Sequence, residues 1–288
     1  MKMNVTKQCF GFAIVMWCMS FAVCAQSESV MLDNGEYQIP AVVLMPDTAI
    51  ASPAVLLLHG SASHKNEVGD LYLRLAELLA NKGIASIRID FAGTGDSPVD
   101  YTHYTLKSAV RDATVALAYL KQQAGVDAKR IGVVGFSQGG LIAQLLLAQQ
   151  PDIKSFVAWS SVASDGIGPF AEMFETLYMT AKKQGNVLQH YGWRSPLLIS
   201  LDWFEQVKVN TSLTDMQRYK GSLLAIAGTN DTVVPPVAAS RLINAAGSDV
   251  ARAVIIKGAD HIFNVLDNNA NQDEQLLDIT TEWFEEAL

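Results

Sequence analysis

Cysteine is almost absent from this sequence. The 288 residues contain three cysteines, Cys9, Cys18 and Cys24, and all of them lie within the first 25 positions. If that segment is removed, the rest of the chain has no disulfide, no thiol nucleophile and no cysteine ligand for a metal. With 50% hydrophobic residues, a chain of this length can bury a core large enough to fold without disulfides.

Runs of one charge sign are also missing. Charged residues make up 17% of the chain, and its net charge of -8 is spread without long acidic or basic runs. This composition argues against nucleic acid or an anionic membrane surface as the main partner. No repeat, low-complexity tract or linker divides the chain, so we expect one domain over residues 26–288.

The first 25 residues have the three parts of a secretory signal peptide. "MKMNVTKQ" carries lysine and no acid, "CFGFAIVMWCMSFAV" is almost wholly apolar, and "VCA" precedes "QSES". We expect cleavage after Ala25, which predicts a periplasmic or secreted protein without a stable membrane anchor. The apolar run is shorter than the roughly 20 residues that a membrane span needs. An uncleaved anchor remains the alternative.

Strand and helix patterns alternate along the rest of the chain. The segment "SVMLDNGEYQIPAVVLMPD" predicts two strands joined around Asn34-Gly35, a strong hairpin signal. The next long helix is expected to begin at Thr105 and end at Gly125, which are good capping residues. Alternation of this kind predicts an α/β fold, with a mostly parallel sheet covered by helices on both faces. The predicted strands are 53–60, 84–90, 130–135, 155–162, 222–228 and 251–258, and the predicted helices are 67–81, 105–125, 138–149, 236–246 and 274–287.

Residues 164–219 interrupt this rhythm. This segment is much longer than a crossover between neighbouring strands requires, so it predicts an inserted helical cap over one end of the sheet. The segment is rich in aromatic residues, which either line a pocket for an apolar or aromatic acyl group or form the cap's own core. These aromatic residues are Phe170, Phe174, Tyr178, Tyr191, Trp193, Trp203 and Phe204.

A serine between glycines stands where a predicted strand meets a predicted helix. In "GFSQG", Ser137 follows an apolar strand and precedes a helix, with Gly135 and Gly139 two positions to either side. The sequence pattern alone is weak, but a serine at such a strained turn projects its hydroxyl beyond the carboxyl edge of the sheet. We therefore expect Ser137 to be a nucleophile.

A serine nucleophile needs a base, and the base needs a group that orients it. Among five histidines, His261 follows the last predicted strand, and Asp231 follows the strand before it. The carboxyl ends of parallel strands meet at one edge, so these side chains are expected beside Ser137. Asp165, after the 155–162 strand, is the alternative acid, while the side chain of Asp260 should diverge from its neighbour His261.

The segment "LLLHGSASHKNE" follows another strand and predicts a site for a developing oxyanion. Two backbone N–H groups are needed there, and we expect them from Gln138, directly after the nucleophile, and from Ser61. His59 is expected to brace this loop, and His64 to be exposed. The turn "DFAGTGDSP" (90–98) lacks the glycine spacing of a phosphate-binding loop and is expected to be structural.

Taken together, these motifs resemble those of the α/β-hydrolase superfamily across the whole mature chain. "HGSASHKNE", "RIDFAGTGDS", "GFSQGG", "GTNDTVVPP" and "GADHIF" are similar to blocks in bacterial serine esterases, including feruloyl (cinnamoyl) esterases with an inserted lid. Peptidases of the prolyl-oligopeptidase and aminopeptidase groups share them too. This chain departs from the usual pattern in the residues that flank the motifs: it has Phe136 where histidine is common, Ala92 where arginine is common, and Ser63 in place of a glycine.

The sequence thus predicts a serine esterase that acts on a small-molecule carboxylic ester, with the catalytic residues Ser137, Asp231 and His261. No metal or organic cofactor is implied. A peptidase or amidase with the same three residues is the nearest alternative, and a hydrolase-like protein that binds ligands without turnover is a third. The sequence leaves the oligomeric state and the acyl and alcohol portions of the substrate open.

Overall fold

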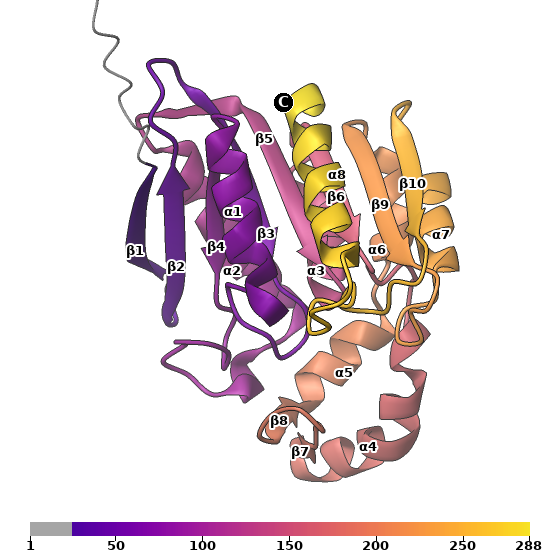
Figure 1. The fold of residues 1–288 in the computed structure, drawn as a ribbon. Coiled ribbons are helices and arrows are strands. Elements are labelled where there is room, and N and C mark those ends of the chain that lie inside the picture. Colours follow the sequence, from indigo (N-terminus) through magenta and orange to yellow (C-terminus); the bar gives the residue numbers. More distant parts are fainter. Residues whose placement is uncertain (1–24) are drawn as a thin grey trace, which may run out of the picture.

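A computed structural model describes residues 25–288, so the expected signal peptide lies outside the described residues except for Ala25. Its centre is an eight-stranded sheet with the strand order β1-β2-β4-β3-β5-β6-β9-β10 (Figure 1). No helix among residues 25–288 is long and apolar enough to cross a membrane. The strands of this sheet are β1 Gln26–Asp33, β2 Gln38–Met45, β3 Ser52–Leu58, β4 Ala85–Ile89, β5 Val126–Phe136, β6 Ser155–Trp159, β9 Ser222–Gly228 and β10 Ala251–Ile256.

The sheet is antiparallel at one edge and parallel elsewhere. The predicted hairpin forms β1 and β2, and β2 also pairs antiparallel with β4, while every other pairing in this sheet is parallel. In the centre, Val134 of β5 lies opposite Leu57 of β3 and Val157 of β6. All three side chains are fully buried, as expected for parallel strands covered on both faces.

Helices cover both faces of the sheet. Along β3, Leu56 and Leu58 belong to the core that includes residues of α2, α3 and α7, whereas Leu57 points to the opposite face and belongs to the core that includes residues of α1 and α8. Figure 1 shows α1 and α8 together in front of the sheet. The α-helices on these faces are α1 Leu71–Asn81, α2 Leu106–Lys121, α3 Gln138–Gln149, α7 Val237–Ala245 and α8 Gln272–Ala287.

Two helix boundaries differ from prediction by more than two residues. The helix predicted from Glu67 begins at Leu71, because Glu67, Gly69 and Asp70 have positive φ angles that no α-helix accommodates. The helix that starts after Thr105 ends at Lys121 and not near Gly125, since Val126 already pairs with β3. Its start is as predicted, because the Thr105 side chain accepts a hydrogen bond from the N–H of Ser108 (3.1 Å).

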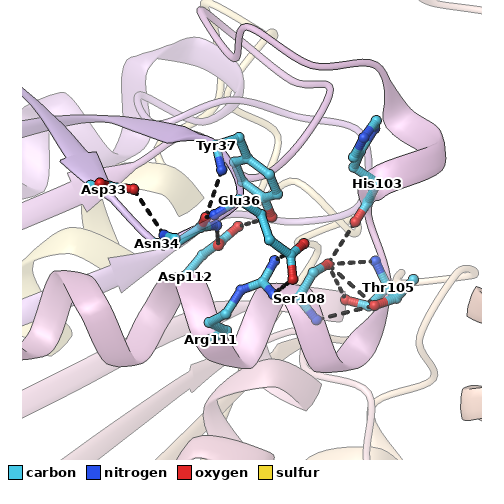
Figure 2. Close-up of polar contacts among 10 residues, drawn as sticks. Asp33, Asn34, Glu36, Tyr37, His103, Thr105, Ser108, Arg111 and Asp112 are labelled. Carbon is cyan, nitrogen blue, oxygen red and sulfur yellow. Dashed lines mark hydrogen bonds and ion pairs between the residues drawn. The ribbon is translucent and has the colours of Figure 1, made fainter.

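A buried carboxylate ties α2 to the N-terminal hairpin (Figure 2). Asp112 is fully buried and accepts hydrogen bonds from Asn34 Nδ2 (2.6 Å) and from the Tyr37 hydroxyl (2.8 Å). Arg111 pairs beside it with Glu36 at 2.9 Å. Burial raises the pKa of Asp112 to about 6, against the opposing effect of its two hydrogen-bond donors.

The insertion between β6 and β9 lies at the carboxyl ends of the parallel strands (Figure 1). It has an aromatic core: Trp203 and Phe204 are buried, and the Phe174 ring lies 5.1 Å from that of Phe204. Most of the aromatic residues noted in the sequence thus build this unit, although Trp193 is 66% exposed. An antiparallel strand pair within it, β7 with β8, was not predicted. The insertion contains α4 Ala171–Gln184, β7 Asn186–Gln189, β8 Leu197–Ser200, α5 Leu201–Lys208 and α6 Ser212–Asp215.

Candidate active site

Ser137 occupies the sharp turn between β5 and α3. Its backbone has φ 52° and ψ -116°, a conformation that L-residues rarely adopt. The turn needs its glycines, because a Cβ on Gly135 would lie 2.6 Å from the carbonyl oxygen of Gly139, and one on Gly139 would lie 2.1 Å from that of Leu58. The Ser137 N–H bonds to the Trp159 carbonyl at 2.9 Å, which anchors the strained residue to β6.

His261 and Asp231 reach the same place from loops after β10 and β9. His261 Nδ1 lies 2.9 Å from Asp231 Oδ2, and His261 Nε2 lies 3.1 Å from Ser137 Oγ. With the proton on Nδ1, His261 donates to the carboxylate, and its Nε2 accepts from the serine hydroxyl. The structure therefore brings together three side chains that the sequence predicted as neighbours, in the order acid, imidazole, hydroxyl.

The Asp231 carboxylate is held rigidly and kept ionised. Its side chain is buried, and Oδ1 accepts hydrogen bonds from the N–H groups of Val233 (2.9 Å) and Val234 (2.8 Å). Burial acts to raise the pKa of Asp231, but the hydrogen bond and charge of His261 and the Val234 N–H outweigh it, so the pKa is lowered. A fixed anion at this position favours one imidazole tautomer.

Asp165, the alternative acid, does not hydrogen-bond to the His261 ring, and the Asp260 side chain turns away from that ring as expected. Asp165 accepts hydrogen bonds from two N–H groups in the first turn of α6, at 3.0 and 3.1 Å. Asp260 accepts from two N–H groups of the turn that follows it, at 3.0 and 2.7 Å. Each carboxylate is thus engaged in a local turn, and Asp231 is the acid paired with the histidine.

The loop after β3 closely approaches the serine. A Cβ on Gly60 would lie 3.5 Å from the Ser137 Cβ, so Ser61, the next residue, is near Ser137. Within residues 25–288 the Ser61 N–H donates no backbone hydrogen bond. Gln138 is the first residue of α3, and an N–H in the first turn of a helix has no intrahelical acceptor. Both predicted oxyanion donors are thus available, and their role stays a prediction.

A buried glutamate that the sequence analysis did not single out holds this loop. Glu67, 2% exposed, accepts hydrogen bonds from the Gly60 N–H (2.7 Å), the Ser63 hydroxyl and the Val68 N–H (2.9 Å). Its only sequence signal is its place at the end of "HGSASHKNE". Its burial arises from tertiary packing and has no signature in the local sequence.

The other two histidines near this loop lie as predicted. His59 is buried, bonds through Nδ1 to the Gly60 carbonyl (2.7 Å) and accepts the Phe91 N–H through Nε2 (3.1 Å). Burial lowers its pKa, so it braces the loop as a neutral ring. His64 is exposed.

The glycine-rich turn after β4 is structural. Asp90 accepts hydrogen bonds from the Lys65 N–H and Nζ, both at 2.7 Å, and from the Asp96 N–H at 2.9 Å. A Cβ on Gly95 would lie 2.1 Å from the Asp90 carboxylate. The turn is therefore closed around an aspartate, which leaves no cradle for a phosphate. Elsewhere in the described chain, no group of three His, Cys, Asp or Glu side chains is placed to hold a metal ion.

The fold and this arrangement agree with the family to which the chain belongs. Residues 55–273 match the model of the alpha/beta hydrolase family, which covers most of the sequence, so this protein is a member of the alpha/beta hydrolase family.

Individual relatives are distant. An uncharacterised protein of Mycobacterium tuberculosis is 26% identical over 211 residues, which cover 73% of this chain and 63% of that protein. The match thus spans less than two thirds of the relative's length. Among solved structures, Est1E from Butyrivibrio proteoclasticus with bound ferulic acid superposes with a TM-score of 0.72 at 20% identity, over 90% of this chain and 98% of that one. A monoacylglycerol lipase from Paleococcus ferrophilus gives 0.67 at 19% identity, over 87% and 99%. At these identities, the structures share the fold.

Proposed function

We propose that this protein is a serine hydrolase that cleaves small-molecule carboxylic esters. The observation that carries the proposal is the hydrogen-bonded row from Asp231 through His261 to Ser137, with the serine on a strained turn. A hydroxyl so placed has a base within reach of its proton, and the base has a fixed anion behind it. Est1E, which binds ferulic acid, and the monoacylglycerol lipase share this fold, which suits the assignment.

The proposed reaction has two stages. His261 Nε2 takes the proton of Ser137 as Oγ attacks the ester carbonyl, and the N–H groups of Ser61 and Gln138 stabilise the negative oxygen. Collapse expels the alcohol, which receives the proton from His261, and leaves an acyl-serine. Water then attacks the acyl carbon while His261 accepts its proton, and the acid departs as Ser137 regains its hydrogen. Asp231 orients the imidazole and stabilises its cationic form throughout.

The decisive experiment compares wild type with Ser137→Ala on a panel of p-nitrophenyl acyl esters and aminoacyl p-nitroanilides. We expect ester hydrolysis that depends on Ser137, with weak or no anilide cleavage. Preferred cleavage of the anilides would identify a peptidase or amidase instead. A fluorophosphonate probe should label wild type and spare Ser137→Ala, whereas absence of labelling in both proteins would indicate a ligand-binding protein without turnover.

Export is part of the same proposal. The N-terminal pattern supports cleavage after Ala25 and a periplasmic or secreted location. Expression of the full chain in a Gram-negative host, followed by fractionation and N-terminal sequencing, should yield a mature protein that begins at Gln26. A full-length protein that remains in the membrane fraction would support the uncleaved anchor.

A further inference from the structure

An arginine of the insertion lies against the loop that approaches Ser137. Arg194, between β7 and β8, donates from Nη1 to the carbonyl oxygen of Ala62. Its Nε is buried and has no hydrogen-bond partner. Among residues 25–288, Arg194 also forms no ion pair with a carboxylate. A partly buried guanidinium without a counter-ion is uncommon, because removing a cation from water costs free energy that a bound anion would offset.

Most other charges near this arginine are already compensated or exposed. Lys65 pairs with Asp90 at 2.7 Å and with Asp96 at 2.6 Å. The buried Glu67 carboxylate accepts the three hydrogen bonds described above, and Asp70 lies exposed on the rim. Arg88, 5% exposed, also forms no ion pair within the described chain, and it donates from Nε to Asn66 Oδ1 (2.9 Å). Arg194 is therefore the more accessible of two cations in this region for which residues 25–288 supply no ion pair.

Two phenol groups converge on the same loop. Burial raises the pKa of both Tyr101 and Tyr191, while the neighbouring Ser61 hydroxyl and the Arg194 charge act in the opposite direction. Both tyrosine side chains thus lie next to Ser61, within the field of the arginine. Tyr101 is 4% exposed and belongs to the core, whereas Tyr191 is half-buried.

A cavity of about 670 Å³ opens beside these groups. Its volume is in the range of small-molecule sites. The exposed Trp193 ring forms part of its wall, 5.9 Å from the guanidinium carbon of Arg194 and 5.6 Å from the Tyr191 ring. Its lining includes Ala62, Ser63, Glu67, Asp70, Trp193 and Arg194, so the arginine shares the cavity with the two carboxylates described above.

We propose that the substrate is an ester or lactone that carries an ionised carboxylate, and that Arg194 binds this carboxylate in the cavity beside Ser61. The inference rests on the proposed esterase function and narrows it to anionic substrates. Arginine suits the task because its planar guanidinium presents several parallel donors to the two oxygens of a carboxylate. Trp193 supplies an apolar surface for the carbon chain between the carboxylate and the ester.

The test uses matched pairs of esters that differ only in this charge. For a carboxylate in the acyl part, p-nitrophenyl hemiadipate is compared with its neutral methyl ester. For a carboxylate in the alcohol part, p-acetoxybenzoate is compared with methyl p-acetoxybenzoate. We expect wild type to show the higher kcat/KM for the anionic member of one pair, and that pair identifies the part of the substrate that bears the charge. Added NaCl should lower this preference.

Variants separate binding from a merely structural role. Arg194→Gln should lower kcat/KM for the preferred anionic ester about 10- to 100-fold, the usual cost of losing a hydrogen bond to a charged group. The rate for its neutral partner should stay nearly unchanged, and Arg194→Lys should fall between. Arg241→Gln, at an exposed site on α7, removes the same charge elsewhere and should leave the ratio as in wild type.

The proposal is overturned if wild type prefers the neutral member of both pairs, or if Arg194→Gln slows both members of a pair by the same factor. The second result would make Arg194 a support of the Ala62 loop only. Inhibition by adipate with a neutral reporter ester gives a second readout, which should be competitive in wild type and weak in Arg194→Gln. If no ester is hydrolysed in a Ser137-dependent way, the proposed function itself fails.

Discussion

His261 lies between Asp231 and Ser137, with its Nδ1 2.9 Å from the Asp231 carboxylate. The same carboxylate accepts two backbone N–H groups, so its position is fixed from both sides. This relationship joins loops after two different strands and shows that, of three aspartates expected near the same edge, Asp231 is the one that pairs with His261. It also makes the first prediction specific.

Asp231→Asn should lower turnover of a reactive ester by about 10⁴, because an amide favours the wrong imidazole tautomer and does not stabilise the imidazolium. The control is Asp165→Asn, whose carboxylate caps α6 and should leave kcat nearly unchanged. Steady-state kinetics on one p-nitrophenyl ester measures both variants. A larger loss in Asp165→Asn would contradict the assignment of the acid.

Gly139→Ala should damage both stability and activity. The added methyl would lie 2.1 Å from the Leu58 carbonyl oxygen, so β3, its following loop or the serine turn must shift. We expect a loss of about 3 kcal/mol in unfolding free energy, which corresponds to a fall in Tm of about 6–12 °C for a chain of this size. Gly192→Ala is the matched control, because nothing lies within 4 Å of its added Cβ. Equal melting temperatures for the two variants would show that the turn tolerates a side chain.

Glu67→Gln should slow catalysis with little change in KM. The amide retains one acceptor but places an NH₂ group where the carboxylate now meets either the Gly60 N–H or the Ser63 hydroxyl. The loop that carries Ser61 would lose its fixed position, and we expect a fall in kcat of about 10- to 100-fold, below the cost of removing an oxyanion donor outright. Glu77→Gln, exposed on α1, is the control. Wild-type kcat in a folded Glu67→Gln protein would refute the positioning role.

Because Asp112 loses its proton as the pH rises, the free energy of unfolding should fall. Its pKa is raised from 3.8 to about 6 in the folded protein, so the folded state holds the proton more tightly than the unfolded chain does. The stabilising contribution is complete below the unfolded pKa and is lost as the pH rises through the folded pKa, by about 3 kcal/mol.

The measurement is denaturant unfolding at several pH values between 4 and 7. Carboxylates with lowered pKa values, such as Asp231, act in the opposite direction, so the informative quantity is the difference between wild type and Asp112→Asn. As the pH rises, the free energy of unfolding of Asp112→Asn should increase relative to that of wild type. Asp47→Asn, at an exposed site, should run parallel to wild type. A pH-independent difference for Asp112→Asn would contradict the raised pKa.

Much of this protein could be predicted from local sequence. The helix over 138–149 and the strand over 222–228 have the predicted bounds, because apolar periodicity and flanking glycines define them locally. The placement of Ser137, His261 and Asp231 followed from one rule, that parallel strands end at the same edge of a sheet. Two predicted helix boundaries were wrong. The helix does not reach Gly125 because Val126 pairs with β3, and the helix predicted from Glu67 starts later because residues there have positive φ angles.

Features that depend on contacts between residues far apart in the chain were decided by the tertiary structure. The sequence determined that a serine, a histidine and an aspartate would meet at one edge, since strand order and local turns suffice for that. It left open whether Asp165 or Asp231 would pair with the histidine. Only the folded chain buries Glu67 behind the Gly60 loop and brings Arg194 to Ala62, because burial and unpaired charge arise from packing between segments far apart in the chain.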